Sequence, residues 1–189
     1  MVDARVQKSK QALIDAGLKL ININKEISLR DIATEAGVGR ATLYRLFSSK
    51  EALVEEIAVY CLQKIDDASA PIEQKSRSNM HAFELMFQYL MPMTDEFQFL
   101  LSLDYFADEI PQVQSIIDRQ DQDLYAFINS AKEDGEITKK MPTTWIANFI
   151  EGLFYAGWVQ QKEHGANVEE AADLAFTCFK RALKPSLFK

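Results

Sequence analysis

The chain has 189 residues, of which 48% are hydrophobic and 26% are charged, and its net charge is −7. This composition excludes a disordered or fibrous chain and provides enough apolar side chains for a sizeable core. The polar first residues and the absence of an apolar stretch of about 20 residues argue against a secretory signal and a membrane span, so we expect a cytoplasmic protein without membrane contact.

Helical periodicity dominates the chain. The five prolines and seven glycines fall mostly between periodic segments, and no alternating run indicates a strand. We therefore expect an all-α fold of about nine helices. The first helix is predicted over Lys8–Leu20, where Ala12, Leu13 and Ala16 recur on one face.

A capping pattern follows this first helix. Ser28 and Asp31 form an S-x-x-D pair, which predicts a helix from about residue 29 to residue 36. Gly37 is expected to end that helix, because glycine adopts the left-handed conformation without a Cβ penalty. A second short helix is predicted to start at Arg40, with Gly39 as its N-cap.

The second short helix has two different faces. At 100° per residue, Leu43 and Phe47 share one face, whereas Ala41, Thr42 and Arg45 lie on the opposite side. The apolar face is expected to pack on the preceding helix, and the polar face is expected to remain free. Two such helices joined by a glycine turn indicate a helix-turn-helix.

The sequence of this segment resembles a known family. The A-G-V turn, the following T-L-Y and the later F-x-x-K-E-x-L are similar to the N-terminal domain of the TetR (tetracycline repressor-like) family over roughly residues 8–54. The resemblance implies a helix-turn-helix DNA-binding domain in residues 1–54 and a ligand-binding and dimerisation domain in residues 55–189.

The candidate DNA contacts follow from the residues and from the resemblance. Arg40 and Arg45 could each bridge guanine O6 and N7 in the major groove, or could hold phosphates only. The resemblance implies that Thr42 and Tyr44 touch the sugar-phosphate strand; it extends to Lys50 and to Ser28, which could instead serve only as a cap. The expected DNA-binding residues are Ser28, Arg40, Ala41, Thr42, Tyr44, Arg45 and Lys50.

The charge distribution agrees with a nucleic-acid partner at one end of the chain. Residues 1–55 carry nine basic and seven acidic side chains, whereas the remainder carries 12 basic and 21 acidic ones. The positive segment is expected to hold phosphates, and the negative remainder to repel them.

A long fourth helix is predicted from about Lys50 to Ala68, with Leu53, Ile57, Cys61 and Ile65 along one face. In relatives this helix connects the ligand site to the DNA site. Further helices are predicted over residues 78–90, from a Thr94 cap to about residue 107, and from residue 111 to just before residue 135.

These later helices carry many aromatic and methionine side chains. Most are expected to form the core, and some could line an adaptable pocket for a small, largely apolar effector. The candidate pocket residues are Phe83, Met86, Phe87, Leu90, Phe106, Tyr125, Ile128, Phe149 and Tyr155.

Two last helices are predicted over residues 143–161 and after an Asn167–Glu170 capping box. By resemblance they pair with their copies in a second subunit and form an isologous homodimer; alternatively they only close the core of one chain. The candidate interface residues are Ile146, Ile150, Leu153, Gly157, Ala172, Ala175, Phe176 and Phe179.

Other functional classes have weaker support. No recognised catalytic or metal-binding arrangement is formed by the carboxylates Asp104, Asp108, Asp118 and Asp121, or by His81 with Glu84, so neither an enzyme nor a metal or cofactor site is expected. Glu151 is expected to face water. It could instead face the pocket, and an unpaired carboxylate there would favour a cationic ligand.

The sequence therefore predicts a DNA-binding transcriptional regulator. We expect a homodimeric repressor that a small-molecule effector releases from a palindromic double-stranded DNA operator. A TetR-like activator and a helical interaction module without effector binding remain as alternatives.

Overall fold

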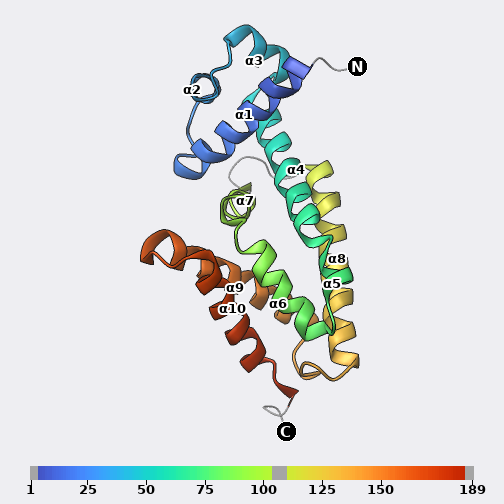
Figure 1. Ribbon diagram of the computed structural model, residues 1–189. Helices are drawn as coiled ribbons and strands as arrows, with labels where there is room; N and C mark the ends of the chain where they lie inside the picture. Colours follow the sequence, from blue (N-terminus) through green and yellow to red (C-terminus); the bar gives the residue numbers. More distant parts are fainter. Residues whose placement is uncertain (1–3, 104–109, 186–189) are drawn as a thin grey trace. The chain divides into compact units, whose positions relative to one another are not determined.

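The computed structural model describes residues 4–103 and 110–185, and every regular element in those ranges is an α-helix (Figure 1). The all-α prediction is thus confirmed. The helices are α1 (Ala4–Ile23), α2 (Leu29–Glu35), α3 (Arg40–Leu46), α4 (Lys50–Ser69), α5 (Ile72–Lys75), α6 (Asn79–Leu90), α7 (Thr94–Leu100), α8 (Pro111–Glu133), α9 (Thr143–His164) and α10 (Val168–Ala182). Without the single turn α5, the described helices match the expected number of about nine.

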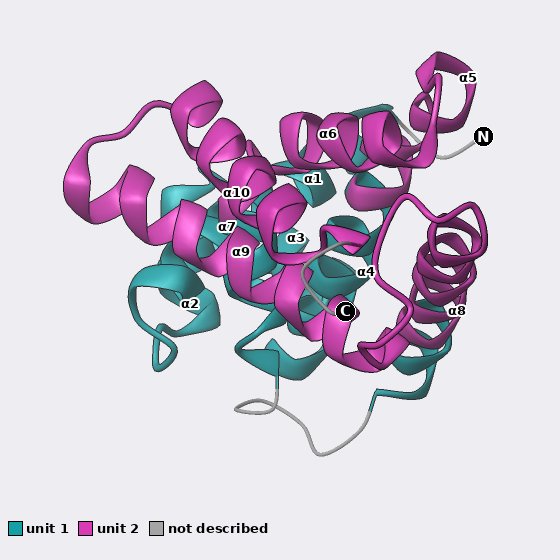
Figure 2. Ribbon diagram, turned by 90° about the horizontal axis from the view of Figure 1, so that it is seen from below, with its two compact units in different colours: residues 1–64, 95–116 teal, residues 65–94, 117–189 magenta. Residues whose placement is uncertain are grey.

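The chain divides into two compact units, coloured separately in Figure 2. Unit 1 comprises residues 1–64 and 95–116, and unit 2 comprises residues 65–94 and 117–189. Packing thus groups the first three quarters of α4 and the whole of α7 except Thr94 with the N-terminal helices. The functional boundary after residue 54 concerns activity rather than packing and stays a prediction.

The core of unit 1 joins α1, α2, α3 and α4. Leu13, Ile32, Leu43 and Leu53, one from each helix, are fully buried. Gly17 allows α1 to approach α4 closely, since a Cβ at this position would lie 2.6 Å from Cδ1 of Ile57. The helix-turn-helix is thereby held on a scaffold of two longer helices.

Helix α7 adds a buried charge to unit 1. The Glu96 side chain is only 9% exposed and forms an ion pair with Lys64 of α4. At the start of α7, the Asp95 carbonyl accepts a hydrogen bond from Asn22 Nδ2 of α1 at 2.8 Å. α7 ends at Leu100, before the predicted end near residue 107, and residues 104–109 lie outside the described ranges.

The core of unit 2 is an aromatic cluster around α6. Phe83 lies with its ring centroid 4.3 Å from that of Phe127 and 4.4 Å from that of Phe179. The ring centroid of Phe87 lies 5.1 Å from that of Phe154. These rings join α6, α8, α9 and α10, so the methionine-rich and aromatic interior predicted from the sequence is present.

Helices α9 and α10 pack on each other and α10 packs on α6. A Cβ on Gly157 would lie 2.5 Å from Met91 Sδ, so this glycine allows close approach of α9 to the end of α6. The predicted capping box of α10 is confirmed: Glu170 N–H donates to Asn167 Oδ1 at 2.9 Å, and Asn167 N–H donates to Glu170 Oε2 at 3.1 Å.

Candidate functional site

The turn between α2 and α3 has the geometry that the sequence predicts. Asp31 N–H donates to Ser28 Oγ at 3.2 Å and caps α2. At the other end of α2, Gly37 has φ +64°, and Val38 N–H donates to the Ala33 carbonyl at 2.9 Å. Together with the Gly37 N–H bond to Thr34, this is a Schellman motif, which fixes the direction in which the chain leaves α2.

Helix α3 is anchored by its apolar face. Leu43 is fully buried and Phe47 is 4% exposed, as their spacing predicts. Gly39 is the N-cap, with extended backbone and no side-chain hydrogen bond. The buried face therefore sets the rotation of α3 about its axis, and with it the direction of the opposite face.

Most of the predicted DNA-binding side chains of α3 are exposed around its buried face. Tyr44 is 60% exposed, Arg40, Ala41 and Arg45 are exposed, and Thr42 is half-buried. Among the described residues, neither Arg40 nor Arg45 takes part in an ion pair. Two positive charges and a phenol hydroxyl are thus available on one short helix.

Ser28 and Lys50 lie outside α3 and already have partners within the chain. The Ser28 hydroxyl donates to Asp31 Oδ2 at 2.5 Å, so the capping role considered for this residue is present. Lys50 Nζ donates to the Lys25 carbonyl. The start of α4 is capped by Ser49, because Ala52 N–H donates to Ser49 Oγ at 3.2 Å. A contact of Ser28 or Lys50 with DNA stays a prediction.

The candidate effector-pocket residues are found mainly in the core of unit 2. Phe83, Met86, Phe87, Leu90 and Ile128 are buried, and Tyr125 and Phe149 are half-buried. Tyr155 is 54% exposed, with its ring 5.6 Å from that of Trp158, so it does not occupy the expected interior position. Phe106 lies outside the described residues.

The candidate dimer residues are largely covered within one chain, and their contact with a second subunit stays a prediction. Leu153 and Phe176 are half-buried, and the other six are buried: Ile146, Ile150, Gly157, Ala172, Ala175 and Phe179. The reason is that α9 and α10 turn their most apolar face toward α6 and toward each other. Closure of one chain's core, the alternative considered from the sequence, accounts for these six residues.

The same two helices leave other apolar residues exposed, and the sequence analysis did not single them out. Trp145 of α9 is 63% exposed and Leu174 of α10 is 56% exposed. Gly152 and Ala156, which follow Trp145 at helical spacing, are exposed as well. The sequence signals for a second face were the small residues Gly152 and Ala156 of α9, which permit close helix approach, and the apolar stripe of α10, which is wider than a terminal surface helix needs.

Two titratable residues of unit 2 that the sequence analysis considered are Glu151 and His81. Glu151 is exposed, as expected; partial desolvation and then the Asp121 charge raise the pKa of its carboxyl. His81 Nδ1 accepts a hydrogen bond from Arg77 N–H at 3.1 Å near the start of α6.

Within residues 4–103 and 110–185, His, Cys, Asp and Glu side chains form no group of three suited to a metal ion. No described helix has the length and apolarity to cross a bilayer.

Comparisons with known proteins agree with this geometry. The family model described as "Bacterial regulatory proteins, tetR family" matches residues 25–57, which include α2, the turn and α3. The HTH-type transcriptional repressor LfrR of Mycolicibacterium smegmatis is 22% identical, in an alignment that covers 83% of this chain and 81% of LfrR. The uncharacterised HTH-type transcriptional regulator YvdT of Bacillus subtilis is 25% identical over 92% of this chain and 94% of its own length.

Solved structures show that the fold is shared over nearly the whole chain. The crystal structure of the TetR-like regulator LfrR from Mycobacterium smegmatis in complex with proflavine superposes with a TM-score of 0.79 at 20% identity, covering 96% of this chain and 98% of LfrR. The helix-turn-helix with its exposed basic residues lies in the segment that the tetR family model matches, and along the rest of the chain the protein is similar in sequence and in fold to TetR-type transcriptional regulators.

Proposed function

We propose that the protein acts as a homodimeric repressor, which binds a near-palindromic operator and leaves it when a small, largely apolar effector binds. In this mechanism the two copies of α3 enter successive major grooves, roughly 34–36 Å apart. DNA recognition, the dimer and the effector each have separate support and a separate test.

The observation that carries DNA recognition is the outer face of α3. Arg40, Tyr44 and Arg45 are exposed, and the buried Leu43 and Phe47 fix the helix beneath them. A guanidinium can donate two hydrogen bonds to guanine O6 and N7, and a phenol hydroxyl can bond a phosphate oxygen. A helix that is anchored by its buried face and exposes these groups suits insertion into a major groove.

Substitution of Arg45 tests this proposal. On an operator recovered from genomic fragments, Arg45→Ala is expected to weaken binding by about 1–3 kcal/mol if the side chain reaches a base, and to relax specificity at one position. If Arg45 contacts a phosphate instead, its removal should lower the slope of log affinity against log salt concentration by about 1, because about one counterion fewer is released on binding. Fluorescence anisotropy at several salt concentrations distinguishes the two contacts.

Arg77→Ala is the matched control, since Arg77 is an exposed arginine of unit 2 and its removal changes the net charge equally. We expect wild-type operator affinity for this variant. If Arg45→Ala and Arg77→Ala both bind the operator as tightly as the wild type, Arg45 is not a recognition residue.

We place the dimer contact on the exposed apolar side of α9 and α10. The exposed residues on these helices include Trp145, Gly152 and Ala156 of α9 and Leu174 of α10, and the space beside Gly152 is open, since a Cβ there meets no atom within 4 Å. Small residues permit two helices to approach closely, and an exposed tryptophan is a typical anchor of an interface. The homologous surface of a second copy would complete the contact.

Gly152→Arg is expected to yield monomers in sedimentation velocity, because an arginine fits the open space of a single chain and obstructs the approach of a second one. Ser130→Arg adds the same side chain at an exposed position of α8 and should remain a dimer. A stable Gly152→Arg dimer would place the interface elsewhere.

The aromatic interior of unit 2 supports an apolar effector, because aromatic and methionine side chains can rearrange around such ligands. Proflavine, which is bound in the solved LfrR structure, is the first probe to use. A ligand that lowers operator affinity a thousandfold must favour the released form by about 4 kcal/mol. A compound that raises the melting temperature of the protein but leaves the operator complex intact at saturation would contradict release.

A further inference from the structure

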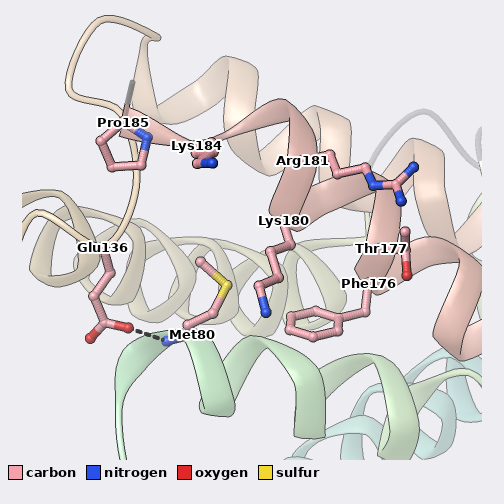
Figure 3. Close-up of a pocket in the computed structure, with 8 residues that line it drawn as sticks. All are labelled: Met80, Glu136, Phe176, Thr177, Lys180, Arg181, Lys184 and Pro185. Atoms are coloured by element: carbon pink, nitrogen blue, oxygen red, sulfur yellow. Dashed lines mark hydrogen bonds between the residues drawn. The ribbon is translucent and has the colours of Figure 1, made fainter. Parts of the chain in front are cut away.

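At the C-terminal end of α10, unit 2 contains a pocket of about 620 Å³ that belongs neither to the DNA-binding face nor to the aromatic core (Figure 3). Its walls come from the start of α6, the segment after α8 and the last turns of α10. They include Met80, Glu136, Phe176, Lys180, Arg181 and Lys184. The volume lies within the usual range of small-molecule sites, roughly 300–1,000 Å³.

Positive charge predominates in this pocket. Lys180, Arg181 and Lys184 contribute three cations and Glu136 one carboxylate, although the chain as a whole has a net charge of −7. Within the described residues none of the three cations forms an ion pair. Their charge is therefore available to a ligand.

The Glu136 carboxylate is already occupied by the backbone of α6. Its Oε1 accepts from Asn79 N–H at 3.0 Å and its Oε2 accepts from Met80 N–H at 2.7 Å, the latter bond being drawn in Figure 3. The carboxylate thus caps the positive end of α6. Glu136 thus forms its hydrogen bonds with the backbone of α6 and forms no ion pair with the cations across the pocket.

Basic side chains in the last turn of a helix often serve only to offset its negative end. Here the carbonyl of the C-cap residue has another partner, because Thr138 N–H donates to the Leu183 carbonyl at 2.9 Å. The Lys180 side chain points into the pocket between Met80 and Phe176 in Figure 3, and its Nζ lies 5.8 Å from the centroid of the Phe176 ring. Its ammonium group faces the pocket.

The pocket also offers apolar surface next to the charge. Met80 and Phe176 are half-buried and lie on either side of the Lys180 side chain. We propose that this pocket binds a small organic anion, with its carboxylate or phosphate group held by Lys180 and Lys184 and its apolar part on Met80 and Phe176. Such a site is independent of operator binding, and its ligand is chemically distinct from a largely apolar effector of the aromatic core.

The test uses 2-naphthoate as the probe and its neutral analogue 2-naphthamide as the chemical control. In isothermal titration of the full chain, we expect naphthoate to bind, added salt to weaken it and naphthamide to bind at least about tenfold more weakly. Lys180→Gln is expected to reduce naphthoate affinity about tenfold, and a second substitution, Lys184→Gln, to reduce it further.

Lys139→Gln provides the matched control, because Lys139 is an exposed lysine of unit 2 that does not line the pocket. It should bind naphthoate as the wild type does. A thermal melt of each variant shows whether the fold is retained.

Methionine methyl resonances locate the bound probe independently of the variants. The chain has six methionines, and only Met80 contributes to the walls of this pocket. Naphthoate is expected to shift the Met80 methyl signal, assigned with Met80→Leu, and to leave that of Met86 in the core unchanged. Absence of binding, undiminished binding to Lys180→Gln, or shifts at Met86 without Met80 would each overturn the proposal.

Discussion

The glycine turn between α2 and α3 permits a prediction that depends on a single backbone angle. Gly37 and Gly39 both have open space around them, since a Cβ at either position meets no atom within 4 Å. They differ in backbone conformation: Gly37 has φ +64° and Gly39 has φ −67°. Alanine at residue 37 must therefore adopt the left-handed conformation, whereas alanine at residue 39 need not.

The left-handed conformation costs a non-glycine residue about 1–2 kcal/mol. The lower entropy of the unfolded chain with alanine returns about 0.4–1 kcal/mol. Gly37→Ala should thus reduce the free energy of unfolding by about 1 kcal/mol, or the melting temperature by about 2–4 °C for a chain of this length. In Gly39→Ala, the same entropic gain is opposed by a weaker N-cap, so the net change should be close to zero.

Urea unfolding of both variants, followed by far-ultraviolet circular dichroism, measures this difference. The comparison is internal to one loop, so effects on the unfolded chain largely cancel. If Gly37→Ala is as stable as Gly39→Ala, the left-handed residue does not determine the turn, and the fixed orientation of α3 requires another explanation.

Two further predictions concern titratable groups. Burial, and secondarily the charge of Glu96, raises the pKa of the Cys61 thiol to about 12. In a Cys178→Ser variant, Cys61 is the single thiol, and it should resist labelling by Ellman's reagent at about pH 8 but react fully in denaturant. Rapid labelling of the folded variant would contradict the burial of Cys61. Partial desolvation and the nearby Asp121 raise the pKa of the Glu151 carboxyl. The folded state therefore binds the proton of this carboxyl more tightly than the unfolded chain does. The stability that the protonated carboxyl contributes is lost as the pH rises through the pKa of the folded state. The Glu151→Gln variant should accordingly have a larger free energy of unfolding than the wild type at about pH 7 but not below about pH 4. If urea unfolding shows the same gain in stability at both pH values, titration of Glu151 is not the cause of the gain.

Local features of the fold were predictable from the sequence because they depend on residues three or four positions apart. The Ser28 cap, the left-handed Gly37 and the capping box of Asn167 and Glu170 are all present as predicted. The same holds for the buried pair Leu43 and Phe47, whose spacing alone defines one face of α3.

Features that depend on convergence of distant segments were not predictable. An apolar stripe does not reveal whether it packs inside its own chain or against a second one, and Ile146 and Phe179 turned out to be buried within unit 2. Glu96 follows Asp95 in the first turn of α7, where acidic residues are usually solvated, yet it is buried beside Lys64. The pocket at the end of α10 requires residues near 80, 136 and 180 to meet, and no motif joins them.

The central claim is that this regulator recognises a specific operator with two copies of α3. Selection of genomic fragments by the purified protein, followed by footprinting of the enriched sites at near-physiological salt, tests it directly. The account predicts a protected site with two-fold symmetry, whose half-sites lie about one helical turn of DNA apart. Weak, salt-sensitive binding to all fragments without enrichment of any site would contradict it.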